Sequence, residues 1–126
     1  MATGLLVAWF NLGPVADAAW TMGDVDAIGR LDPIVHSPAR LTILAVLAVA
    51  KEADFLFLQR ETGVTKGNLS SHLSRLEEAG YVMIEKAFVG RKPHTRCRLS
   101  DDGRTAFDEY RAHMASILER VAQGES

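Results

Sequence analysis

The segment from Thr65 to Ala79 is rich in side chains that form hydrogen bonds and poor in apolar ones. Its leucines, Leu69, Leu73 and Leu76, are spaced to form one narrow stripe on a helix. The rest of that helix would carry Lys66, Gly67, Asn68, Ser70, Ser71, His72 and Arg75. Asn can hydrogen-bond adenine, Arg can hydrogen-bond guanine, and Ser can bond bases or phosphates. These side-chain types suit contact with DNA.

A serine–histidine catalytic site is the competing interpretation, because Ser70, Ser71 and Ser74 lie near His72 in the sequence. A catalytic base needs an orienting partner and a pocket, and neighbours on an exposed helix supply neither. The four histidines are too scattered for a metal cluster, and a single cysteine excludes any two-cysteine metal site within the chain. The sequence therefore predicts no enzyme, no metal site and no cofactor.

The charge is distributed unevenly, although the net charge is only -2. Residues 59–98 carry a charge of +4, so the remainder of the chain carries -6. Residues 86–98 contain five basic side chains and no acidic one: Lys86, Arg91, Lys92, Arg96 and Arg98. A cationic segment beside a polar helix, on an otherwise acidic chain, is typical of a phosphate-binding surface. The alternative is a solvated hairpin whose charges prevent edge aggregation, and the preceding polar helix favours the first interpretation.

Capping residues indicate where the first helices begin. Asp32-Pro33 and Ser37-Pro38 each place an N-cap oxygen before a proline suited to the first helical position, so a helix start is predicted at both. The run Ala39–Ala50 is apolar almost all round. We therefore expect it to form a buried central helix.

A helix-turn-helix is predicted next. A short helix follows Asp54 and stops at Gly63, and Thr65 then caps the polar helix, which ends at Ala79 before Gly80. Two helices joined by the four residues 62–65 match this motif.

After Gly80, the spacing of apolar residues changes from the helical repeat of about 3.6 residues to the strand repeat of two. Tyr81–Val89 reads as a strand, Gly90–His94 as a turn and Thr95–Leu99 as a second strand. Cys97 alternates with arginines, which predicts that this small side chain is buried. The result is a β-hairpin with a basic tip.

A last amphipathic helix is expected over about 101–123, capped by Ser100. Apolar residues recur along it at heptad-like spacing: Phe107, Tyr110, Met114, Ile117 and Val121. This face can either pack on the protein's own core or form a seam to a second copy.

The 126 residues, 48% hydrophobic and 24% charged, fit one compact domain, expected over residues 23–126. The hydrophobic stretch 1–22 contains no Lys or Arg and is interrupted by Gly13 and Pro14, so it lacks the features of a signal peptide or membrane span. We expect a cytoplasmic protein without a membrane partner. The stretch is either a helix that packs on a partner subunit or a poorly ordered extension, with Met22 an alternative start of the domain.

Several segments are similar to winged-helix transcriptional regulators related to the MarR and ArsR groups. They are HSPARLTIL (36–44), the Phe55 and Leu58 pair, TKGNLSSHLSRLEEAGYV (65–82) and FVGRKPHTRCRLSDDGR (88–104). The order of the predicted elements also resembles this group, and the resemblance covers residues 32–118. It implies a mainly α fold with a small β-hairpin, a winged helix-turn-helix with an added C-terminal amphipathic helix.

The resemblance also implies roles. Residues 65–79 would be the recognition helix and 90–94 the tip of the wing, in a small repressor that binds double-stranded DNA as a homodimer, with recognition helices in successive major grooves. The implied DNA-binding residues are Thr65, Lys66, Gly67, Asn68, Ser70, Ser71, His72, Arg75, Arg91, Lys92, His94 and Arg96. The implied dimerisation residues are Phe107, Tyr110, Met114, Ile117 and Val121.

The chain also departs from the family pattern. Metal sensors of the ArsR type use cysteine pairs, which Cys97 alone cannot supply, and Phe57 is apolar where a polar, exposed residue is expected. A winged helix that serves only as a protein-interaction module is the alternative function. A small-molecule effector is compatible with a regulator, although the sequence indicates no pocket for one.

Overall fold

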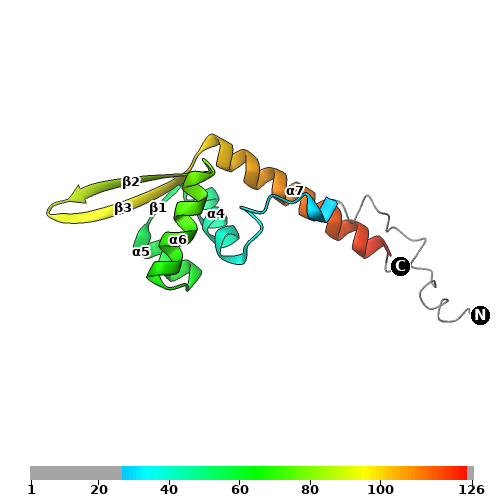
Figure 1. Ribbon diagram of the computed structural model, residues 1–126, viewed down its shortest axis with the longest axis horizontal. Coiled ribbons are helices and arrows are strands. Elements are labelled where there is room, and N and C mark those ends of the chain that lie inside the picture. Colours follow the sequence, from blue (N-terminus) through cyan, green and yellow to red (C-terminus); the bar gives the residue numbers. More distant parts are fainter. Residues whose placement is uncertain (1–26, 125–126) are drawn as a thin grey trace, which may run out of the picture. The chain divides into compact units, whose positions relative to one another are not determined.

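The computed structural model describes residues 27–124, so the extension predicted over 1–22 and the first residues of the predicted domain lie outside the described part. The chain divides into two compact units, residues 32–110 and residues 1–31 with 111–126. The elements, in chain order, are α4 (Pro38–Ala50), β1 (Glu52–Asp54), α5 (Phe55–Thr62), α6 (Lys66–Glu78), β2 (Val82–Val89), β3 (Lys92–Leu99) and α7 (Asp101–Gly124) (Figure 1). None of the described helices is long and apolar enough to cross a membrane.

Helix α4 begins where predicted, with Ser37 as its N-cap and Pro38 at its first position. Its buried residues are Ile43, Leu44 and Leu47, which lie on one side of the helix. The helix was expected to be buried, but only one face of it is, since Val49 is 86% exposed. The other elements cover only one face of α4.

The helix start predicted at Asp32 is also wrong, because Asp32 begins a single turn. Its Oδ1 accepts a hydrogen bond of 2.9 Å from the Ile34 amide, and its carbonyl accepts one of 2.8 Å from the His36 amide. The cap at Ser37 then starts α4, which leaves room for only one turn. We call residues 32–36 the entry turn.

The helix-turn-helix prediction is confirmed locally. The Asp54 carboxylate caps α5 by accepting from the Phe57 amide at 2.8 Å, and Gly63 ends the helix with φ +70°. Thr65 Oγ1 then accepts from the Asn68 amide at 3.1 Å and caps α6. Helices α5 and α6 are therefore joined by the three residues 63–65.

The sheet has three antiparallel strands in the order β1-β3-β2. Ala53, Cys97 and Ile84 lie opposite one another across it, and Cys97 is fully buried, as its alternation with arginines predicted. Strand β1 was not predicted. It has only three residues and exists by pairing with β3.

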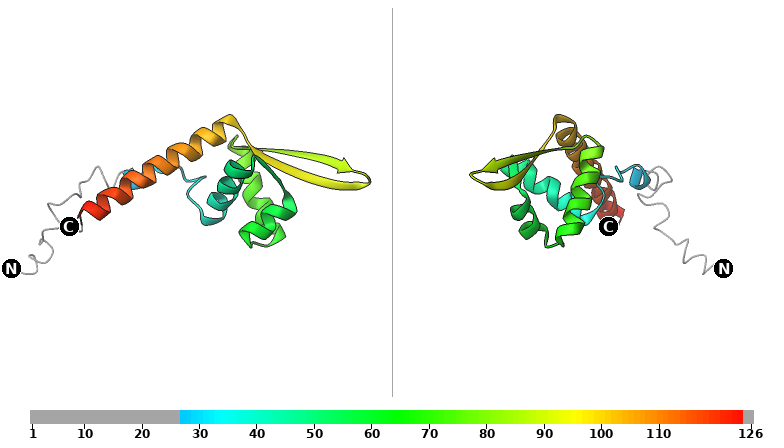
Figure 2. Two further views of the ribbon diagram at one scale, coloured as in Figure 1. Left: turned by 180° about the vertical axis from the view of Figure 1, so that it is seen from behind. Right: turned by 60° about the vertical axis from the view of Figure 1, so that its left-hand side comes forward.

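The hairpin is longer than predicted and its turn is shorter. Strand β3 begins at Lys92, so Gly90 and Arg91 alone form the turn, and Gly90 takes the positive φ, +67°, that a tight turn requires. Pro93 lies within the strand. It is tolerated because β1 pairs only with residues 96–98, which leaves this part of β3 a free edge on that side. Both views of Figure 2 show the hairpin extending beyond the helices α4, α5 and α6.

Helix α7 begins at its predicted cap, since Ser100 Oγ accepts from the Gly103 amide at 2.9 Å. Phe107 and Tyr110 are buried within residues 32–110, and Leu31 and Ile117 are buried in the other unit. The core of residues 32–110 is completed by Val35, Ile43, Leu44, Leu47, Ala53, Leu58, Leu69, Leu73, Leu76, Val82 and Cys97.

Candidate nucleic-acid interface

The polar face of α6 is open to solvent. Its three leucines are buried against the core. Most of the DNA-binding residues predicted in this segment are exposed: Thr65, Lys66, Gly67, Asn68, Ser70, Ser71 and Arg75. A Cβ added to Gly67 would meet no atom within 4 Å. The backbone of the first helical turn is therefore bare and can be approached closely.

His72 differs from the rest of this set, because it is half-buried and bonded to the protein. Its Nδ1 lies 3.1 Å from Nη1 of Arg40 on α4. Burial, and then the positive charges of Arg40 and Arg75, hold the pKa of His72 below its usual value. The imidazole is consequently neutral near pH 7.

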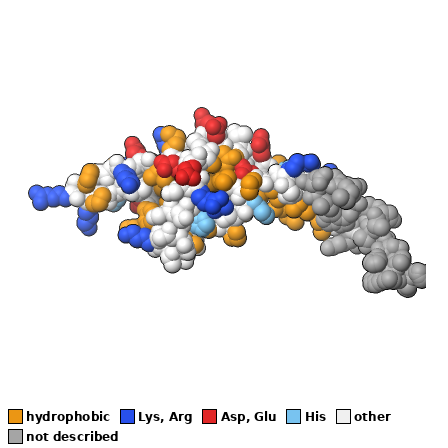
Figure 3. All heavy atoms as spheres, in the orientation of Figure 1, with side chains coloured by type: hydrophobic (Ala, Val, Ile, Leu, Met, Phe, Trp, Pro, Cys, Tyr) orange, Lys and Arg blue, Asp and Glu red, His pale blue; other side chains and the backbone are white. Residues whose placement is uncertain are grey.

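The free end of the hairpin carries exposed cations. Arg91 lies in the turn and Lys92 beside it, and both are exposed. Figure 3 shows basic side chains at this end of the molecule. His94 lies on β3 two residues after Lys92, where it is half-buried and opposite Ala87. An apolar side chain, Phe88, is 73% exposed near the same end, a feature that the charge pattern did not indicate.

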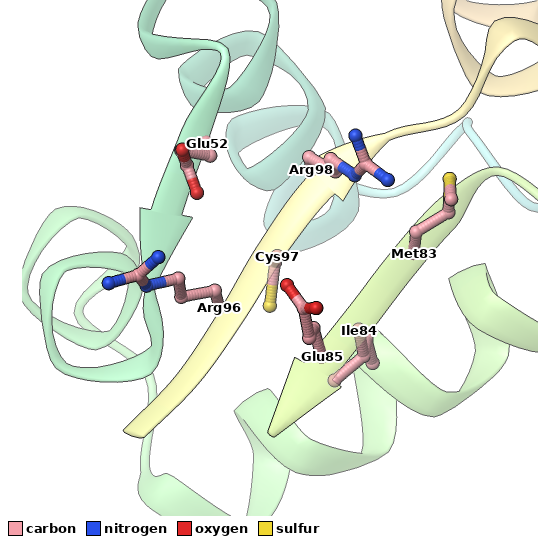
Figure 4. Close-up of a pocket in the computed structure, with 7 residues that line it drawn as sticks. All are labelled: Glu52, Met83, Ile84, Glu85, Arg96, Cys97 and Arg98. Atoms are coloured by element: carbon pink, nitrogen blue, oxygen red, sulfur yellow. The ribbon is translucent and has the colours of Figure 1, made fainter. Parts of the chain in front are cut away.

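The base of the hairpin is balanced in charge. Arg96 lies opposite Glu85 on β2, and Arg98 lies opposite Glu52 on β1. These four side chains line a hollow of about 240 Å³ with Met83, Ile84 and Cys97 (Figure 4). The structure therefore separates Arg96 from the tip residues with which it was grouped. The hairpin cations with no acidic residue opposite them are Arg91 and Lys92 at the tip and Lys86, which lies opposite Thr95 midway along the hairpin.

Cys97 forms part of this hollow but has no reactive character. Burial, followed by the charges of Glu77 and Asp54, raises the pKa of its thiol to about 11. The thiol is protonated at neutral pH, so its function is packing.

The residues predicted for dimerisation fall into both units of the chain. Phe107 and Tyr110 belong to residues 32–110 and are buried there, with the Tyr110 hydroxyl 2.6 Å from His36 Nδ1. Ile117 is buried in the other unit, where Met114 and Val121 are half-buried. Leu118, which was not in the predicted set, is 59% exposed. The sequence allowed this face either to pack on the protein's own core or to contact a second copy. Phe107 and Tyr110 pack on the core.

Phe57 was noted as apolar at an exposed position. It is 36% exposed on α5, and the guanidinium of Arg60 lies 6.0 Å from the centre of its ring. The basic side chain thus covers part of the aromatic face.

Known proteins share this architecture. The family described as the winged helix DNA-binding domain matches residues 39–118. An uncharacterized protein of Methanocaldococcus jannaschii is 35% identical over 77 residues, which are 61% of this chain and 84% of that protein.

Solved structures agree. A transcriptional regulator homologue from Pyrococcus horikoshii superposes with a TM-score of 0.72 at 26% identity, over 79% of this chain and 97% of that one. A MarR-family transcriptional regulator from Silicibacter pomeroyi gives a TM-score of 0.57 at 22% identity, over 100% of this chain and 83% of that one. The resemblance and the fold class expected from the sequence are confirmed. The hairpin is the wing, and the chain belongs to the winged-helix DNA-binding domain family.

Proposed function

We propose that the chain is a cytoplasmic, sequence-specific DNA-binding transcriptional regulator that acts as a homodimeric repressor. Helix α6 enters the major groove, and the wing, residues 88–98, contacts the backbone or the minor groove. Exposed side chains of α6 supply base contacts, while Arg91 and Lys92 supply phosphate contacts. Phosphate contacts set affinity, and base contacts set specificity.

The observation that supports this proposal is that two surfaces suited to DNA, the exposed face of α6 and the tip of the wing, belong to neighbouring elements. The exposed face of α6 holds polar side chains of modest length over a first turn with no side chain at Gly67, and the wing holds two exposed cations, Arg91 and Lys92, at its free end. At the base of the wing, Glu52 and Glu85 offset Arg96 and Arg98. A hairpin whose charges only kept it soluble would not need this segregation of charge.

The test is binding to DNA duplexes measured by fluorescence anisotropy. One duplex comes from the region upstream of the chain's own coding sequence and the other is its scrambled counterpart, each at 50 and 200 mM salt. With three or four phosphate contacts per subunit, about six to eight per dimer, affinity should fall by about three to four decades over that range. Tight binding with preference for the upstream duplex supports the regulator, whereas no binding to either duplex at low salt favours a protein-interaction module.

A homodimer is expected because one winged helix spans only one half-site. The exposed Leu118, with Met114 and Val121, gives α7 an apolar surface for a second copy. Light scattering at micromolar concentration should give twice the mass of the 126-residue chain. The variant Leu118→Lys should shift this mass toward the monomer, and a wild-type protein that is strictly monomeric would contradict the proposal.

A further inference from the structure

Arg40, to which the sequence assigned no function, is held in one orientation by the entry turn. Its Nε donates to the Ile34 carbonyl at 2.5 Å, and its Nη2 donates to the Pro33 carbonyl at 3.3 Å. The third contact, from Nη1, is to His72 Nδ1 on α6 at 3.1 Å. The guanidinium is planar, so the two carbonyl contacts fix the direction in which Nη1 points.

This contact decides which nitrogen of His72 carries the proton. Arginine has donors only, so Nδ1 must accept and cannot hold a hydrogen. A neutral imidazole with an unprotonated Nδ1 carries its proton on Nε2. The lowered pKa of His72, caused by burial and by Arg40 and Arg75, agrees with a neutral ring.

Within residues 27–124, no side chain or backbone group is bonded to the Nε2–H of His72, so this donor has no partner in the described part of the chain. On α6, His72 lies at the edge of the polar face, with exposed Arg75 one turn away on one side and buried Leu76 on the other. We propose that Arg40 is a positioning residue that holds His72 in its Nε2–H form, so that His72 donates one hydrogen bond to an acceptor on a base edge in the major groove.

This inference rests on the proposed function. Guanine O6 and N7, adenine N7 and thymine O4 are the acceptors in that groove, and the amino donors of cytosine and adenine are excluded. A histidine free to exchange its proton between nitrogens could accept as well as donate. With Nδ1 occupied by Arg40, His72 discriminates between acceptors and donors at one base pair in each half-site.

Two amide variants separate the two halves of the imidazole. His72→Asn places an amide oxygen near the position of Nδ1, so it keeps the acceptor for Arg40 and loses the outer donor. His72→Gln places an amide nitrogen near the position of Nε2, so it keeps the outer donor. On the duplex bound by the wild type, we expect His72→Asn to lose about tenfold or more in affinity, and His72→Gln to stay within about threefold. Equal affinities for wild type and His72→Asn would overturn the base contact.

The tautomer is tested in the free protein, without DNA. Long-range ¹⁵N–¹H NMR spectra distinguish Nδ1 from Nε2 protonation, and at pH 7.5 we expect His72 to give the Nε2–H pattern. In Arg40→Lys the pattern should shift toward exchange between both forms, with thermal unfolding as the check that the variant is folded. A wild-type His72 that is protonated on Nδ1 overturns the positioning by Arg40, while the Nε2–H pattern in a protein that binds no duplex overturns only the DNA contact and the proposed function.

Discussion

Replacing both Arg91 and Lys92 by alanine is expected to flatten the salt dependence of DNA binding. The two side chains are exposed at the free end of the wing, so the fold should tolerate their removal. If each neutralises one phosphate in each subunit, a dimer loses about four contacts, and the slope of log affinity against log salt falls by about 3.6. Between 50 and 200 mM salt, the wild type should lose about three to four decades of affinity and the variant only about one to two.

A matched control removes the same charge elsewhere. The double variant Lys51→Gln with Arg104→Gln also takes two positive charges from the chain, but one lies at the end of α4 and the other near the start of α7, both outside the proposed interface. We expect its slope to stay within about 1 of the wild type. An equal fall in both variants would mean a general effect of net charge, and an unchanged slope in the tip variant would remove the wing from the interface.

Features that depend on local chemistry could be predicted from the sequence. Ser37, Thr65 and Ser100 each cap the helix that was expected to follow, because capping needs only a side-chain oxygen and a nearby free amide. Cys97 is buried because alternation along a strand fixes which side chains share a face. These signals extend over a few residues and do not depend on the rest of the fold.

Features decided by distant partners were missed or misplaced. Asp32-Pro33 carries the same cap signal as Ser37-Pro38, but the second signal follows so closely that only a turn fits between them. The three residues of β1 have no strand pattern of their own. The turn of the hairpin was predicted too long because Pro93 reads as a loop residue, and its tolerance depends on where β1 stops pairing with β3.

The candidate site shows the same division. A count of charges along the chain located the wing, but only the register of the strands shows that Arg96 lies opposite Glu85, whereas Arg91 and Lys92 at the tip have no acidic residue opposite them. The contact between Arg40 and His72 joins residues that are 32 positions apart. No pattern of spacing in a single sequence indicates such a pair, although Arg40 lies within the segment 36–44 that carried the family resemblance.

Gly103 is the residue of α7 at which we expect the largest effect on stability. Its α-carbon lies against the backbone of Tyr81, where α6 is joined to β2. The Tyr81 carbonyl accepts from the Ser100 amide at 3.0 Å, and Ser100 Oγ donates to the Gly80 carbonyl at 2.5 Å. A Cβ on residue 103 would lie 2.8 Å from the Tyr81 carbonyl carbon, and closer still to the carbonyl oxygen. Because the atoms in the way are backbone, no change of rotamer can relieve the clash.

Gly103→Ala is therefore expected to destabilise the fold, although alanine is the better helix former by about 0.8 to 1 kcal/mol. Overpacking costs of about 1 to 3 kcal/mol apply where side chains can adjust, and a backbone clash belongs at or above the top of that range. The net loss should be about 2 kcal/mol, so the urea midpoint should fall by about 1 M when measured at one fixed protein concentration. Gly67→Ala is the matched control: it lies in the first turn of α6 with nothing within 4 Å of the new Cβ, and should raise stability by about 0.5 to 1 kcal/mol. Since the same substitution is made near the start of two helices, opposite signs would show that Tyr81 requires the glycine at 103. A gain in stability at both positions would contradict the close packing of α7 on the junction that follows α6.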